Sequence, residues 1–366
     1  MGKARQKHTG KQGNAKIQGQ GAIGTQNPEP RTDAGAGPRG GRQRARSVVL
    51  LAGLLVALAS VVLVGGRHML AAQQGNAAPL PALVALSPAT APRFLFSING
   101  VSRPLGVAVS PDGDRIYVTE SDGARETKLF DRDGRPLGSL NPPDSDPASR
   151  TPVYVALDPE GRVYVSDRQA GTVHRYSPEG SYLGKLDPPG GSWAPLALGF
   201  DPQGNLLATN VSPGKHGVVV LSPEGRLLQQ FGEEGAGEGQ FSYPNGVVVD
   251  RRGRLLVADS NNGRVMVLTQ DGKTLWSLGR GGGAITMGLP RGLAVDDRDR
   301  LYVVDTMNHD VLVFDLGEQE AKLLFTLGDQ GIKDGQFGFP NGIALDRNGR
   351  LYIADRENNR VQVWTY

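Results

Sequence analysis

The sequence predicts an all-β fold, a six-bladed β-propeller, preceded by one N-terminal transmembrane helix. Three observations predict it. A proline-led unit of about 45 residues recurs six times towards the C-terminus. Each unit contains short strand patterns separated by tight-turn signals. One uncharged apolar run lies near the N-terminus. The chain has no cysteine, which excludes disulfides, thiol catalysis and thiolate metal sites.

Residues 1–46 are predicted to form a disordered, basic cytoplasmic tail. Up to residue 47 the chain carries ten Lys and Arg against two acidic residues, an excess of +8, and shows no apolar periodicity. The remaining residues hold 30 basic and 35 acidic groups, a net charge of −5. An acidic body is a poor match for a phosphate backbone, so we expect no nucleic-acid partner.

Residues 47–67 are predicted to form a transmembrane helix that acts as a signal anchor. The run from Val48 to Gly66 is nineteen residues long and uncharged. As a helix it would span roughly 28 Å, and the lipid bilayer is therefore an expected partner of residues 48–66. Arg42, Arg44 and Arg46 precede the run and only Arg67 follows it directly. This asymmetry predicts a cytoplasmic N-terminus and an extracytoplasmic propeller. Cleavage after the run, near Leu70–Ala72, stays open.

Residues 68–91 are rich in Ala and Pro and are predicted to be a linker. Residues 92–366 are predicted to form the propeller. The unit beginning at Pro244 shows the pattern best: apolar runs are separated by Arg-Arg-Gly, Asn-Gly and Asp-Gly turns, which gives four antiparallel strands. Equivalent units begin at Pro104, Pro152, Pro195, Pro244, Pro290 and Pro340.

The two ends of this region predict how the ring closes. The chain stops at Tyr366, directly after the third strand pattern of the sixth unit. The missing fourth strand is found at the other end, because Arg93–Ile98 (RFLFSI) is similar to Leu323–Leu327 (LLFTL) and Thr274–Leu278 (TLWSL). We therefore expect 93–98 to complete the last blade in a Velcro-type closure.

These units resemble NHL repeats over residues 93–366. The resemblance rests on the glycine-rich linkers FGEEGAGEGQFSYPNG and LGDQGIKDGQFGFPNG, and on the turns ADSNNGRVMVL and ADRENNRVQVW. The first three units depart from the pattern: Glu120 and Asn210 replace an expected Asp, and Tyr154 and Ala197 replace a Gly. The resemblance implies a six-bladed ring whose prolines surround the mouth of a central channel.

Four aspartates end the second strand of their units. They are Asp167, Asp259, Asp305 and Asp355. A ring of such groups could hold an ion, but repetition in nearly every blade favours a structural role, in which each side chain caps its own turn. We predict no metal and no cofactor.

Related propellers that are enzymes have their active sites at the channel mouth. The residues at this mouth can therefore be compared with those of two enzyme classes. The residues after the six prolines are Leu105, Val153, Leu196, Asn245, Arg291 and Asn341. Amidating lyases, which this chain resembles, place zinc-binding histidines there, and none occurs here. Gluconolactonase-like hydrolases use an Asn, an Asp and a Glu, but Arg291 stands in the slot for the Asp and no Glu opens the first unit.

The sequence therefore favours a non-catalytic, membrane-anchored binding scaffold with no catalytic residue. The partner at one propeller face is a protein, a glycan or a small ligand, and the predicted ligand-binding residues are Asn245, Arg291, Asn341, Arg168 and Arg356. The alternative is a metal-dependent gluconolactonase-like hydrolase. An RNA-binding NHL domain and an amidating lyase are further alternatives that the charge and the mouth residues disfavour.

Overall fold

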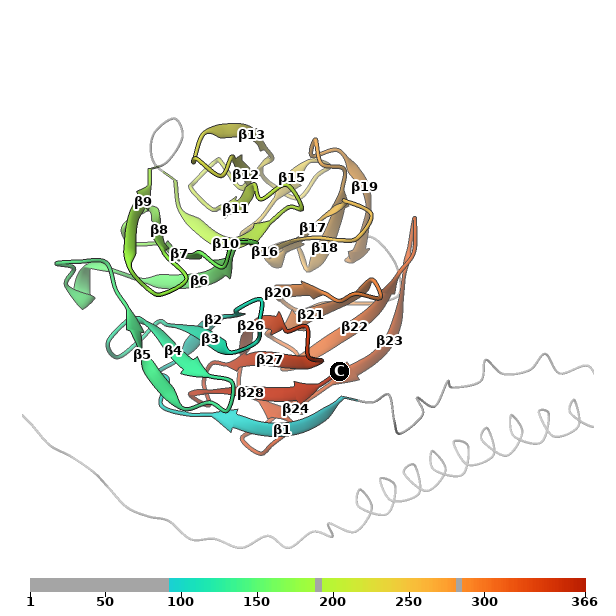
Figure 1. The fold of residues 1–366 in the computed structure, drawn as a ribbon. Coiled ribbons are helices and arrows are strands. Elements are labelled where there is room, and N and C mark those ends of the chain that lie inside the picture. The colour runs from blue at the N-terminus through green and yellow to red at the C-terminus, as the bar shows by residue number, and fades with distance from the viewer. Residues whose placement is uncertain (1–91, 188–192, 281–284) are drawn as a thin grey trace, which may run out of the picture. The chain divides into compact units, whose positions relative to one another are not determined.

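Six four-stranded antiparallel sheets surround a common centre in the computed structural model, which describes residues 92–187, 193–280 and 285–366 (Figure 1). The innermost strands all begin at a proline. They are β2 (Pro104–Val109), β6 (Pro152–Leu157), β10 (Pro195–Phe200), β16 (Pro244–Val249), β20 (Pro290–Val295) and β26 (Pro340–Leu345). Each contacts the next, and β26 contacts β2, so the ring is closed. The predicted six-bladed propeller is confirmed.

The second and third strands of the blades are mostly buried, least so the third strand of the first blade. The second strands are β3 (Arg115–Glu120), β7 (Val163–Asp167), β11 (Leu206–Asn210), β17 (Leu255–Asp259), β21 (Arg300–Asp305) and β27 (Arg350–Asp355). The third strands are β4 (Thr127–Asp131), β8 (Thr172–Tyr176), β12 (Gly217–Leu221), β18 (Arg264–Leu268), β22 (Asp310–Leu316) and β28 (Arg360–Thr365). Burial on both sides explains their continuous apolar runs.

The outermost strands complete the blades. They are β5 (Pro136–Leu140), β9 (Tyr182–Leu186), β13 (Leu227–Phe231), β19 (Thr274–Gly279), β23 (Ala321–Leu327) and, for the sixth blade, β1 (Arg93–Ile98). The sixth sheet has the order β1-β28-β27-β26, and Phe96 pairs with Val363. The expected closure of the ring by residues 93–98 is therefore confirmed.

Each outermost strand contains a β-bulge at the same place. The extra residue is leucine in all six blades: Leu95, Leu137, Leu183, Leu228, Leu275 and Leu324. A bulge bends the strand and interrupts its regular hydrogen bonding. The rim of the ring is thus irregular in every blade.

The two faces of the ring carry different connections. Pro244 pairs with Asp259, so the start of an innermost strand and the end of the second strand lie together. We call this side the proline face; it also carries the turns between the second and third strands, including η2 (Ser260–Asn262). The opposite side carries the tight hairpins of each blade, and we call it the hairpin face. A loop with η1 (Pro147–Ser149) joins the first two blades.

Close packing at the centre explains the glycine two residues after most of the prolines. A Cβ on Gly342 would lie 2.4 Å from the carbonyl oxygen of Leu105 in the next blade, and one on Gly292 would lie 2.5 Å from that of Asn341. A side chain there would force neighbouring strands apart. The second blade differs because Tyr154 occupies this position and is buried.

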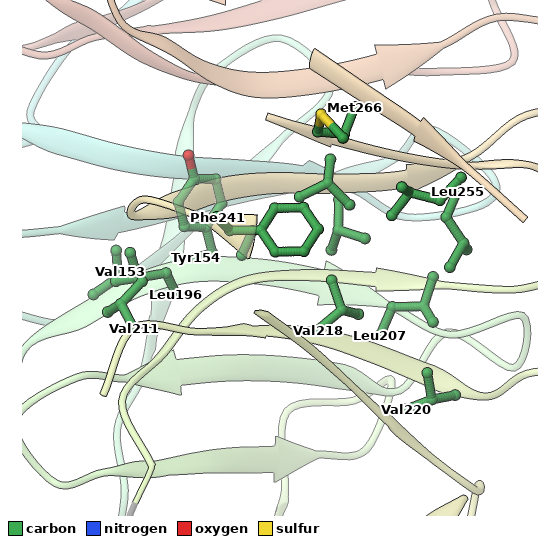
Figure 2. Packing of buried hydrophobic residues seen from close by; sticks show 14 residues of the cluster. Val153, Tyr154, Leu196, Leu207, Val211, Val218, Val220, Phe241, Leu255 and Met266 are labelled. Atoms are coloured by element: carbon green, nitrogen blue, oxygen red, sulfur yellow. The ribbon is translucent and has the colours of Figure 1, made fainter. Parts of the chain in front are cut away.

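The glycine-rich linkers place a phenylalanine between blades. β14 (Glu233–Glu234) pairs in parallel with β15 (Gln240–Phe241), and β24 (Asp329–Gln330) pairs in the same way with β25 (Gln336–Phe337). A Cβ on Gly328, where φ is 90°, would lie 2.2 Å from the Phe337 ring. The glycine therefore makes room for the ring. Phe241 packs with Val218 and Leu255 in a buried cluster (Figure 2).

The segments before residue 92 fall outside the described residues. This applies to the predicted tail, the transmembrane helix at 47–67 and the linker. Within the described residues, none of the helices is long and apolar enough to span a bilayer.

Candidate functional site

The mouth of the central channel on the proline face contains three of the predicted ligand-binding residues. Asn245, Arg291 and Asn341 are the second residues of β16, β20 and β26. Behind them lies a channel of about 290 Å³ that is lined by the innermost strands. Arg168 and Arg356 follow the second strands of their blades, and these turns lie on the same face. The fold thus gathers all five on one side of the ring.

Arg291 and Asn341 are in direct contact. The Arg291 Nη1 donates a 2.7 Å hydrogen bond to Asn341 Oδ1. The Asn341 Nδ2 donates to the carbonyl oxygen of Leu105, at 2.9 Å, and lies 3.4 Å from the Tyr154 hydroxyl. Asn341 is only 1% exposed, so its amide is fixed by these partners and holds the guanidinium in place.

Tyr154 was expected only to differ from the glycine of the repeat, and it was not predicted as a site residue. Its ring packs in the cluster with Val153 and Leu196, and its hydroxyl points away from them (Figure 2). Burial raises the pKa of the phenol well above its usual range, which keeps the hydroxyl neutral. The larger side chain in place of glycine therefore lines the channel and places its hydroxyl beside the Asn341 amide.

Arg356 lies within electrostatic reach of Arg291. Burial lowers the pKa of Arg356, and the positive charges of Arg103 and Arg291 lower it further, while Glu357 acts in the opposite direction. The Arg356 Nη1 is 3.4 Å from the Glu357 Oε1, and the Arg103 Nη2 donates to the same oxygen at 2.5 Å. Two guanidinium groups thus share one carboxylate, and the charge of a third, Arg291, acts on Arg356.

Arg103 and Glu357 were not predicted as site residues. Arg103 precedes Pro104 and has a left-handed backbone, with φ of 46°. Its amide N–H donates to Asn359 Oδ1 at 2.9 Å, and its carbonyl accepts from the Ser121 hydroxyl at 2.9 Å. These contacts hold a backbone conformation that is unfavourable for arginine and that fixes where the side chain starts.

The other two predicted residues make fewer side-chain contacts. Asn245 is half-buried and Arg168 is exposed. Neither side chain forms a hydrogen bond to any residue in the described ranges. They remain predictions as ligand-binding residues.

The four predicted turn caps bind backbone N–H groups. Asp167 accepts from the N–H of Ala170 in its own turn and from that of Thr151, which precedes the innermost strand. Asp355 accepts from the N–H of Gly338, and its other oxygen accepts from Arg360 Nε at 2.7 Å. Asp259 and Asp305 make corresponding contacts. Each carboxylate therefore connects two segments of its own blade.

The histidines and carboxylates of the described residues do not converge on one point. The described residues contain no group of three His, Cys, Asp or Glu that could hold one metal ion. His174, His216 and His309 lie in three different blades, and each has a neighbour: Tyr182, Tyr243 and Phe339, respectively. Three convergent protein ligands are the usual minimum for catalytic zinc.

The hairpin face has a hollow of about 440 Å³ that includes four aspartates. Two of them pair with an arginine four residues later: Asp158 with Arg162 at 2.5 Å, and Asp250 with Arg254 at 2.6 Å. The other two, Asp201 and Asp346, accept hydrogen bonds within their own hairpins. The carboxylates on this face thus serve their own hairpins.

The fold and the repeats define the class of protein as a six-bladed propeller. The family model of the NHL repeat matches residues 241–268, 287–314 and 337–364. The chain thus carries NHL repeats in the last three blades of a six-bladed propeller, and the predicted resemblance is confirmed there.

The curated relatives include a protein named for its NHL repeats and an enzyme. NHL repeat-containing protein 3 of Mus musculus is 29% identical over 181 residues, which is 45% of this chain and 51% of that protein. Peptidyl-glycine alpha-amidating monooxygenase of Mus musculus is 27% identical over 136 residues, 33% of this chain and 14% of that protein. This chain thus spans about half of the first relative and much less of the second.

Solved structures share the fold. A streptogramin B lyase structure superposes with a TM-score of 0.58 at 16% identity, covering 76% of this chain and 99% of that chain. At this identity the similarity concerns the architecture, and function has to be argued from the site.

Proposed function

We propose that this chain is a non-catalytic binding propeller that is held at the outer surface of a membrane and recognises a partner on its proline face. The observation that carries the proposal is the Arg291 guanidinium, fixed by Asn341 at the channel mouth. Its Nε is buried and has no partner among the described residues. A fixed, incompletely bonded guanidinium is suited to bind a carboxylate or phosphate.

A protein is the partner class that the rest of this face favours over a glycan or a small ligand. Tyr243, Phe339 and Met307 are 39%, 37% and 53% exposed. Tyr243 and Phe339 directly precede the prolines, and Met307 lies in a turn of the same face. Aromatic residues, methionine and arginine are the residues enriched at protein–protein interfaces.

The anchoring part of the proposal rests on the sequence. The apolar run 48–66 and the arginines that precede it support a cytoplasmic N-terminus and an external propeller. Such an arrangement would present one face of a rigid ring to molecules outside the cell membrane.

Cross-linking tests the proposed function. A photoreactive amino acid replaces Tyr243 or Phe339 on the proline face, or Lys273 on the hairpin face, in the full-length chain in its native membrane. We expect a discrete cross-linked protein from the first two positions and none from Lys273. Adducts from the hairpin face alone, or from no position, would contradict the proposal.

A metal-dependent hydrolase is the competing class, and the enzymes among the relatives make it worth testing directly. Metal analysis of the purified full-length chain separates the two. Stoichiometric Ca²⁺ or Zn²⁺, together with a melting temperature that falls on chelation, would favour the enzyme.

A further inference from the structure

Three positions of the repeat carry a different type of residue in one blade than in neighbouring blades. The residue before the proline is Tyr243 in the fourth blade and Phe339 in the sixth, but Arg103 in the first. The residue after the proline is Asn245 in the fourth blade and Asn341 in the sixth. In the fifth blade it is Arg291. Both arginines therefore occupy positions where neighbouring blades use uncharged side chains.

The third departure lies in the turn after the second strand. Ser260 and Thr306 donate their hydroxyl protons to the carbonyl oxygens of Pro290 and Pro340 in the next blade, at 2.5 and 2.7 Å. Arg356 is the equivalent residue of the sixth blade, and Arg168 is that of the second. An arginine here lacks the hydroxyl group by which Ser260 and Thr306 bind the next blade, and Arg356 instead shares a carboxylate with Arg103.

The three exceptions meet at one place, the join between the fifth, sixth and first blades. Arg103 and Arg356 share the Glu357 carboxylate, and the Arg291 guanidinium, which is held by Asn341 of the sixth blade, contributes to the lowered pKa of Arg356. Each of the three arginines has a buried Nε with no partner in the described part of the chain. Against these three positive charges Glu357 supplies one negative charge, so the group has an uncompensated charge of about +2.

This positive group sits on an acidic domain. Residues 92–366 contain 29 Lys and Arg and 35 Asp and Glu. A long polyanion such as RNA needs a continuous basic surface, and most of this ring would repel it. A short acidic segment needs only a local site. Glu357 already shows that a carboxylate fits between two of these guanidinium groups, those of Arg103 and Arg356.

We propose that this cluster binds a short acidic segment of a partner protein, with Arg103, Arg291 and Arg356 as the recognition residues and Glu357 as a built-in competitor that sets the affinity. The proposal rests on the proposed function and specifies its partner. A carboxylate of the partner would bind the free edges of Arg291 and Arg356, beside the exposed Phe339 on the same face.

Binding of a labelled tetraglutamate peptide to the full-length chain in non-ionic detergent tests the proposal. Tetraglutamine is the neutral control peptide. The chain offers replacements from its own repeats: Arg291→Asn, Arg356→Ser and Arg103→Tyr. We expect each to weaken tetraglutamate binding by about tenfold, because a charged hydrogen bond is lost. Arg226→Gln is the matched control, since this exposed arginine lies in a hairpin on the other face.

Glu357→Gln provides a test in the opposite direction. Removing the resident carboxylate should strengthen tetraglutamate binding about threefold, which loss of folding could not do. Melting temperatures of all variants check that the ring is intact.

Three results would overturn the proposal. The first is that the wild-type chain does not bind tetraglutamate, or that the arginine and Glu357 variants bind it as the wild type does. The second is that inorganic phosphate displaces the peptide more strongly than chloride at equal ionic strength. The third is that the chain binds an oligouridine RNA more tightly than the peptide. If cross-linking on the proline face persists in the arginine variants, the proposed function stands and only this specification of the partner fails.

Discussion

Ile98, near the start of the propeller, pairs with Val361 in the last strand of the chain. The two ends of a long segment are thus hydrogen-bonded within one sheet, and the ring has no open seam. Ile98 is 1% exposed and packs with Val101, Val118 and Val363. The closure therefore adds apolar burial to its backbone hydrogen bonds.

Replacing Ile98 with alanine should weaken the ring at its closure. We expect Ile98→Ala to lower the free energy of unfolding by about 3 kcal/mol, because a buried side chain leaves a cavity. The matched control is Leu95→Ala in the same strand, where the bulged side chain is 36% exposed. Chemical denaturation measures both. Equal losses would contradict the closure as described, and so would a silent deletion of residues 93–98.

His309 should be replaceable by asparagine but not by alanine. Its Nδ1 accepts the N–H of Phe339 at 3.0 Å, and its backbone is left-handed with φ of 59°. Asn359 plays the same part for Arg103, with φ of 53°. We expect His309→Ala to cost about 2 kcal/mol, from a lost acceptor and an unfavourable backbone, and His309→Asn to cost clearly less.

Thermal unfolding of both His309 variants, together with the wild type, measures this difference. Asn359→Ala is the companion variant, and it should behave like His309→Ala. Equal losses for alanine and asparagine at position 309 would assign the stabilisation to the imidazole ring packed on Phe339.

Asp310 should make the propeller less stable as the pH rises. Burial and the negative charge of Asp305 raise its pKa to about 6. The corresponding residues of the fourth and sixth blades are Arg264 and Arg360, which pair with Asp259 and Asp355. The native state therefore keeps a proton that the unfolded chain releases between about pH 4 and 6. The free energy of unfolding falls over this range as pH rises.

Asp310→Asn removes that dependence. Because the side chain is only partly buried, we expect a gain of about 1 to 2 kcal/mol at pH 7.5 and almost none at pH 4. Asp315→Asn, an exposed change in the same strand, is the control. Denaturation at the two pH values checks the prediction, and a gain of equal size at both would contradict it.

The topology of the chain can be tested with epitope tags. A tag after Tyr366 should be accessible to antibody in intact cells, and a tag before Met1 only after permeabilisation. Changing Arg42, Arg44 and Arg46 to alanine should lower the fraction of correctly oriented chains, while Arg67→Ala should not. A tag at Tyr366 that is protected in intact cells would contradict the predicted orientation.

The propeller could be predicted from the sequence because its signals are local and repeated. Each signal depends on a few neighbouring residues: a proline, an Asn-Gly or Asp-Gly turn, or an apolar run. Because the signals recur in six units, each unit supports the interpretation of the others. Even the closure by 93–98 was predictable, since Tyr366 leaves the last unit one strand short.

The site was only partly predictable. Arg291, Asn341 and Arg356 follow from their positions in the repeat. Arg103 and Glu357 were missed because their contact joins residues far apart in the chain, and because the left-handed backbone of Arg103 is fixed by Asn359 and Ser121 rather than by its own sequence. Aligning the blades and asking where arginine replaces a neutral residue would have found Arg103.

The leucine bulges of the outermost strands bear on how densely such rings can be packed. A regular outer strand offers free N–H and C=O groups to any other strand, and six of them would make each molecule a template for sheet-to-sheet association. Interrupting all six at the same point denies an incoming strand a continuous register. Many copies could then stand side by side at high local concentration and remain separate particles.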